Sequence, residues 1–81
     1  MTDEVEARVA AVVAHETDRP AAEIAPAQKL AFDLGVDSLD FVKLIAAIED
    51  AFGIVLDDEA AAGIETVADL VAVVRRTITS P

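Results

Sequence analysis

Apolar residues recur at steps of three and four residues in three separate segments of this chain. The three stripes are Val5, Val9, Val12 and Val13; Phe41, Leu44, Ile45, Ile48 and Phe52; and Val67, Leu70, Val71, Val74 and Ile78. Such spacing puts apolar side chains on one face of a helix. Helices this short are not stable alone, so the three stripes must pack against one another. The pattern therefore predicts an all-α fold.

Turn and capping residues divide the chain into three main helices and one short helix. The expected helices cover about residues 3–16, 37 or 38 to 52, 57–62 and 67–78. We expect Thr2 to cap the first, Gly53 to end the second, and a capping box of Thr66 and Asp69 to open the last. The predicted fold class is a small four-helix bundle with a short third helix.

Residues 17–36 are expected to form a long loop between the first two main helices. Pro20 and Pro26 interrupt any long helix there, and no alternating strand pattern appears. A loop of this length in a small domain is usually functional or packed along its length. The apolar residues that could hold it against the core are Ile24, Leu30 and Leu34.

Length and charge limit what the protein can do. With 81 residues the chain is expected to form a single domain over residues 1–81. The 16 acidic and 6 basic residues give a formal net charge of -10. A chain this acidic repels nucleic acids and anionic membranes, so we expect neither as a partner, and we expect partners with basic patches.

No apolar run is long enough for a membrane span, and no secretory signal is visible. We therefore expect the protein in the cytoplasm. We also expect it to be a monomer.

Few residues could support catalysis or bind a metal. There is no Cys, which excludes disulfides, thiolate zinc sites and a cysteine nucleophile. His15, the only histidine, lies at the end of the first helix, where a surface role is the simplest interpretation. The acidic run of residues 57–59 lacks the spacing of a calcium loop and suits a helix N-terminus. We predict no catalytic residues, no metal site and no enzyme activity.

Ser38 and the exposed side of the second helix remain as candidates for function. Ser38 could cap the helix, or it could expose its hydroxyl near the free N–H groups of the first turn. Leu39 and Val42 lie off the main apolar stripe. They could form a docking surface ringed by acidic residues, or they could pack against the preceding loop.

The segment around Ser38 resembles the attachment motif of acyl carrier proteins. Residues 33–40 read Asp-Leu-Gly-Val-Asp-Ser-Leu-Asp, and the family carries Asp-Leu-Gly-x-Asp-Ser-Leu at the start of its second helix. Further similar blocks are residues 49–54, 57–59 and 64–70, so the resemblance covers essentially the whole chain. It implies a free-standing acyl carrier protein in fatty acid or polyketide-type biosynthesis.

The resemblance implies a cofactor and partners. Ser38 would receive 4'-phosphopantetheine from coenzyme A through a phosphopantetheinyl transferase, and the arm's thiol would hold acyl groups as thioesters. Acyl-transfer enzymes, ketosynthases and related enzymes would then dock through basic patches. The implied docking residues are Asp37, Leu39, Asp40, Val42, Glu49, Asp50, Asp58 and Glu59. The implied acyl-pocket residues are Phe41, Leu44, Ile45, Ile48, Ile64 and Leu70.

Several positions depart from the usual family pattern. Lys43 stands where fatty-acid carriers usually have an acid, and Phe41 occupies a position that is commonly smaller. Phe32 replaces a frequent acid, and it could be an exposed aromatic contact or could fold under the loop. These departures favour a specialised carrier. Two other functions are open: an aminoacyl or peptidyl carrier, or an unmodified acidic interaction domain.

Overall fold

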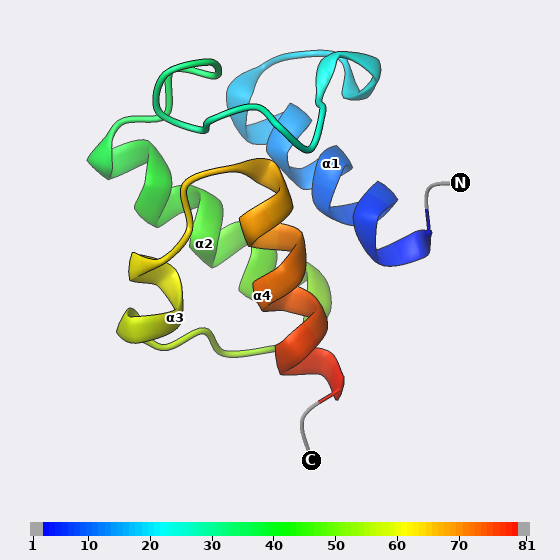
Figure 1. Ribbon diagram of the computed structural model, residues 1–81, viewed down its shortest axis with the longest axis vertical. Coiled ribbons are helices and arrows are strands. Elements are labelled where there is room, and N and C mark those ends of the chain that lie inside the picture. The colour runs from blue at the N-terminus through cyan, green and yellow to red at the C-terminus, as the bar shows by residue number, and fades with distance from the viewer. Residues whose placement is uncertain (1–2, 80–81) are drawn as a thin grey trace.

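The computed structural model describes residues 3–79, which form a bundle of helices with one long connecting loop (Figure 1). The α-helices are α1 (Glu4–Thr17), α2 (Ser38–Phe52), α3 (Asp58–Ala62) and α4 (Val67–Thr79), and one 3-10 turn, η1, spans Ala21–Glu23. Within the described residues no strand forms beyond one isolated bridge between Lys29 and Thr66. The predicted all-α bundle with a short third helix is confirmed.

The three sequence stripes meet in one core. Six side chains are almost completely buried, two from each long helix: Val9, Val13, Leu44, Ile48, Leu70 and Val74. Burial of such side chains contributes about 1.5–3 kcal/mol each. Because every long helix supplies two of them, no helix can leave without exposing the core.

Aspartates cap three of the helices. The carboxylates of Asp3, Asp37 and Asp57 each accept a hydrogen bond from the backbone N–H three residues further on, at 2.8–2.9 Å. Thr2, the expected cap of the first helix, lies outside the described residues, and Asp3 occupies the N-cap position of α1 instead. Each cap satisfies a backbone donor that the helix itself leaves free.

The start of α4 follows the predicted capping box. The Asp69 carboxylate accepts from the Thr66 N–H, and the Thr66 hydroxyl accepts from the Asp69 N–H, both at 3.0 Å. The backbone N–H of Glu65 also donates to the Asp69 carboxylate at 3.0 Å. These donors stabilise the ionised carboxylate, and the Glu65 and Thr66 N–H groups lower the pKa of Asp69 below its ordinary value of 3.8.

The loop between α1 and α2 is held by its side chains and its backbone. Leu30 and Leu34 are buried and Ile24 is half-buried, as predicted. Three backbone hydrogen bonds of 2.9–3.1 Å also join the loop to the start of α4, which the sequence did not predict: Leu30 N–H to Glu65, Val67 N–H to Gln28, and Ala68 N–H to Pro26. The loop is therefore fixed along its second half.

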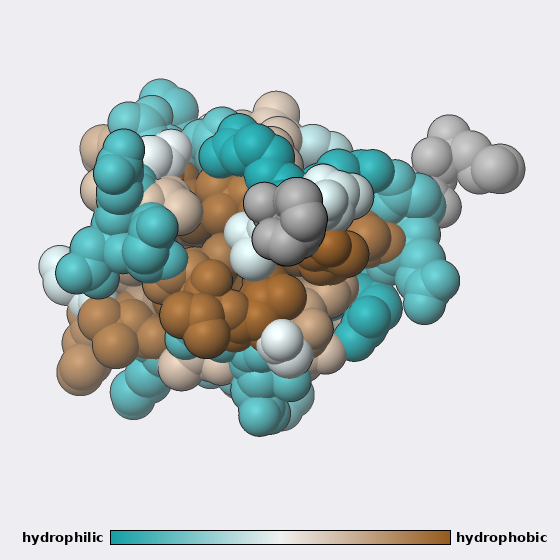
Figure 2. Space-filling view, turned by 90° about the horizontal axis from the view of Figure 1, so that it is seen from below, coloured by the Kyte–Doolittle hydropathy of each residue, from teal (hydrophilic) through white to brown (hydrophobic). Residues whose placement is uncertain are grey.

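The C-terminal end of α2 is closed by contacts with other segments. Gly53 adopts a left-handed conformation with φ 65°, as expected of a C-terminal cap. Arg8 of α1 donates to the carbonyl of Ala51 at 2.6 Å, and its guanidinium lies 4.4 Å from the Phe52 ring centroid. The following connector exposes Val55, and Figure 2 shows apolar surface at this lower end of the molecule.

No helix within residues 3–79 is both long and apolar enough to cross a membrane.

Candidate functional site

Ser38 is the first residue of α2, and its side chain is exposed. The N-cap is Asp37, whose carboxylate accepts the Asp40 N–H at 2.8 Å. Ser38 is therefore not the capping residue, and that interpretation of it is wrong. Its hydroxyl stands at the mouth of the helix, where the first-turn N–H groups favour a negatively charged substituent.

The segment before Ser38 is a tight turn. The Val36 N–H donates to the Leu30 carbonyl at 2.9 Å, and the Lys29 N–H donates to the Asp33 carboxylate at 2.7 Å. Gly35 closes the turn with φ 68°, and a Cβ atom there would meet no other atom within 4 Å. The glycine is therefore needed for its backbone conformation and not for space. The turn fixes the direction in which the chain enters α2.

A groove of about 630 Å³ opens beside Ser38. Its walls come from the loop, the first two turns of α2, and the segment from the end of α3 to Glu65. The residues with larger apolar side chains that line it are Leu30, Phe32, Val36, Phe41, Val42 and Ile64. The groove is therefore largely apolar, as ligand pockets usually are, and Ser38 is one of the residues that line it.

The predicted acyl-pocket residues divide between this groove and the core. Phe41 and Ile64 line the groove. Leu44, Ile48 and Leu70 are at most 1% exposed and belong to the packed core. Ile45 is half-buried and packs against the core from the side. An acyl chain that reached the three core residues would have to separate helices, so the groove is the part of the predicted pocket that is open in this structure.

The apolar residues predicted to dock partners are exposed. Leu39 is 66% and Val42 64% exposed, so the alternative that they pack against the loop is wrong. Phe32 is 86% exposed, which excludes the alternative that it folds under the loop. These three side chains are accessible around the start of α2.

The acidic residues predicted to dock partners differ in their surroundings. Asp37 serves as the cap of α2, and Asp40, Asp50 and Asp58 are exposed. Glu59 is exposed too, but it lines a separate groove between α3 and α4. The set therefore does not form one continuous surface around Ser38.

Glu49 is half-buried, and its carboxylate accepts the Leu56 N–H at 2.8 Å. This bond holds the connector that follows α2, a structural task that the sequence pattern did not reveal. No local motif marks a glutamate that binds a backbone N–H seven residues later, so only the folded chain could show it.

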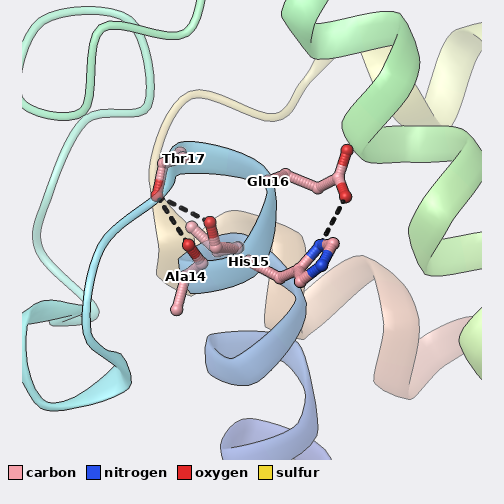
Figure 3. A network of polar contacts seen from close by, with 5 residues as sticks. Ala14, His15, Glu16 and Thr17 are labelled. Carbon is pink, nitrogen blue, oxygen red and sulfur yellow. Dashed lines mark hydrogen bonds and ion pairs between the residues drawn. The ribbon is translucent and has the colours of Figure 1, made fainter.

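His15 lies at the exposed C-terminal end of α1 (Figure 3), and it does not line the groove beside Ser38. Its Nδ1 is 3.1 Å from the Glu16 carboxylate, and the Thr17 hydroxyl donates to the Val13 carbonyl at 2.7 Å. The helix itself ends at Asp18, whose backbone N–H donates to the Ala14 and His15 carbonyls. Within residues 3–79 no group of three or more possible metal ligands comes together.

Residues 7–74 match the family model described as "phosphopantetheine attachment site". This match covers most of the chain, and the chain belongs to this family of carrier proteins. The family's prosthetic group is 4'-phosphopantetheine, and its members interact with transferases and biosynthetic enzymes. An exposed hydroxyl at a helix start beside an apolar groove fits such a group.

Proposed function

We propose that Ser38 is the attachment residue and that residues 1–81 act as one acyl-carrier domain for fatty acid or polyketide-type biosynthesis. The observation that supports this most is the position of Ser38. It is exposed at the first residue of α2, its capping role is taken by Asp37, and it borders an apolar groove.

The protein needs a prosthetic group to carry a thioester, because its own sequence contains no Cys. With no Cys in the sequence, the protein has no thiol to form a thioester, and the attached arm supplies that thiol. A transferase would join the Ser38 oxygen to the arm through a phosphodiester. The first-turn N–H groups of α2 would face this negative group. The protein's part is to present the arm, and it is itself non-catalytic.

The groove supports an acyl cargo. Phe41 of α2 and Ile64 of the segment between α3 and α4 both line the groove. A short or rigid acyl group could rest there without opening the core, whereas a long saturated chain would need space between Leu44, Ile48 and Leu70. We therefore favour short or functionalised acyl groups over long saturated chains.

A chain-length series of acyl thioesters tests this cargo assignment. Short acyl groups should be protected from hydrolysis, and protection should not increase further as the saturated chain lengthens. Rising protection up to long saturated chains would contradict it. Efficient loading by an amino-acid-activating enzyme, with no acyl transfer, would instead assign an aminoacyl or peptidyl carrier.

Partner docking is expected around the start of α2. Leu39 and Val42 supply apolar contact, and Asp40 supplies negative charge beside Ser38. We propose that the transferase, acyl-transfer enzymes and ketosynthases bind this surface through basic patches that surround an apolar centre. Association would be transient and weakened by salt.

The attachment proposal is tested by intact mass after incubation with coenzyme A, magnesium and a phosphopantetheinyl transferase. The chain has two serines, Ser38 and Ser80, so Ser80→Ala is a matched control. Wild type and Ser80→Ala should each gain one phosphopantetheinyl group, and Ser38→Ala should gain none. Modification of a folded Ser38→Ala variant would refute the assignment, and no modification of wild type would favour an unmodified interaction domain.

A further inference from the structure

Two loop side chains, Lys29 and Phe32, line the groove together with Ser38. The Lys29 ammonium lies 5.7 Å from the centroid of the Phe32 ring, within the range of a cation–π contact. The ring is 86% exposed, so most of its surface is free to contact a second group. A cation and an aromatic ring are thus paired beside the candidate attachment residue.

Backbone hydrogen bonds hold this pair in place from two sides. On the side of α4, the Leu30 N–H donates to the Glu65 carbonyl at 3.0 Å. On the side of α2, the Val36 N–H donates to the Leu30 carbonyl at 2.9 Å. Because both bonds lie next to Lys29 in the chain, its backbone cannot move away from the groove without breaking them.

Lys29 differs in charge from the other ionisable residues that line the groove beside Ser38, which are acidic. Asp37 and Glu65 also line the groove, and Asp40 lies on the first turn of α2. A phosphodiester on Ser38 would carry one more negative charge into this acidic setting and would be repelled by the carboxylates. Among the residues that line the groove, Lys29 is the one cation, and none of the ion pairs formed within residues 3–79 involves it.

We propose that Lys29 and Phe32 form a binding site on this chain for the prosthetic arm itself, a proposal that rests on attachment at Ser38. The Lys29 ammonium offsets the charge of the phosphodiester, as lysine does in other phosphate sites. The Phe32 ring covers apolar atoms of the arm against the groove. The site holds the arm before any acyl group is loaded, and it is weak enough to release the arm to a partner.

The test compares apo and modified protein by NMR, with isotope labels in the lysine and phenylalanine side chains. Modification should shift the Lys29 side-chain and Phe32 ring signals and produce through-space contacts between the arm and the ring. Lys29→Gln should weaken these contacts by about twofold or more, the size expected for an exposed charge pair. Lys29→Arg should keep them, and Phe32→Ala should reduce the shift at Lys29 that the arm causes.

Lys43→Gln is the matched control, because Lys43 is an exposed lysine on α2 that does not line the groove. It should leave the arm contacts unchanged. A rise in salt should move the Lys29 signals of modified wild type back toward their apo positions, and this needs no substitution.

The outcomes separate the two proposals. If wild type gains no mass at Ser38, the attachment proposal fails and the arm site fails with it. If wild type is fully modified at Ser38 but the Lys29 and Phe32 signals stay at their apo positions, only the arm site is overturned. It is also overturned if Lys29→Gln behaves as Lys43→Gln does.

Discussion

The two ends of α2 carry similar residues but are used differently. At the N-terminal end, Leu39, Asp40 and Val42 are exposed around Ser38. At the C-terminal end, Phe52 is half-buried beneath the Arg8 guanidinium, and the Glu49 carboxylate is bonded to the connector. The sequence shows apolar and acidic residues at both ends. The difference lies in which of them already have partners within the fold.

This difference shows which residues are available to other proteins. A side chain that satisfies a backbone N–H or covers an aromatic ring stabilises the bundle, and its removal is felt in the free energy of unfolding. A side chain without such a contact can be removed from the bundle at little cost and affects binding instead. Glu49 at the C-terminal end and Asp40 at the N-terminal end are therefore expected to respond in opposite ways to substitution.

The largest effect on stability is expected at the C-terminal end of α2. Glu49→Ala removes the acceptor of the Leu56 N–H and should lower the free energy of unfolding by about 1–2 kcal/mol. Asp50→Ala, the neighbouring exposed acid, should change it by no more than about 0.5 kcal/mol. Chemical denaturation measures both. If Glu49→Ala and Asp50→Ala change the free energy of unfolding equally, the Glu49 bond to the Leu56 N–H does not stabilise the fold.

Asp37→Ala tests the capping residue at the N-terminal end of α2. Loss of the bond to the Asp40 N–H should cost about 1 kcal/mol of stability, and Asp37→Asn should recover most of it because Asn also caps helices well. Denaturant midpoints of the two variants give the comparison. If Asp37→Ala is as stable as Asp37→Asn, the cap contributes nothing, and Asp37 would act on partners alone.

Charge changes on the exposed face of α2 should affect docking more than folding. Asp40→Lys should weaken transferase binding by about threefold or more at low salt. Lys43→Glu, one turn further on, should strengthen it, because the negative field increases. The KM of the transferase for each apo protein measures both effects, and high salt should bring the values together. Unchanged values at low salt would contradict electrostatic docking.

The smallest effect concerns pH. Backbone N–H groups lower the pKa of Asp69, and the N–H of Glu6 together with Arg75 lowers that of Asp3. Because the folded-state pKa values are depressed, the stability they contribute is present above the ordinary value of 3.8 and is lost as the pH falls through the folded values. The difference in Tm between wild type and Asp69→Asn should therefore be constant near neutral pH and shrink below pH 3.8. A difference that does not change with pH would contradict this account.

The helices were predictable because their signals are local. The stripes of α1, α2 and α4 place Val9, Leu44 and Leu70 in the core, and Gly53 and Thr66 mark helix ends through backbone chemistry that depends on a few neighbours. The exposure of Ser38 followed from its position at a helix start. Periodicity and capping are properties of short segments, so the sequence carries them directly.

The contacts between distant segments were not predictable in the same way. The bonds from the loop to the start of α4, the stacking of Arg8 on Phe52, and the Glu49 bond to Leu56 all depend on how the elements pack. The same holds for the approach of Lys29 to Phe32, since a loop carries no period that would place two side chains together. Packing also decided which predicted pocket residues line the groove.

The most direct test of the central claim is peptide-level localisation of the prosthetic group. Cleavage after Lys29 and Lys43 releases residues 30–43, in which Ser38 is the one hydroxyl residue. After reaction with coenzyme A and the transferase, we predict that this peptide alone gains the phosphopantetheinyl mass. A gain on the C-terminal peptide of residues 77–81, or no gain on residues 30–43, would contradict attachment at Ser38.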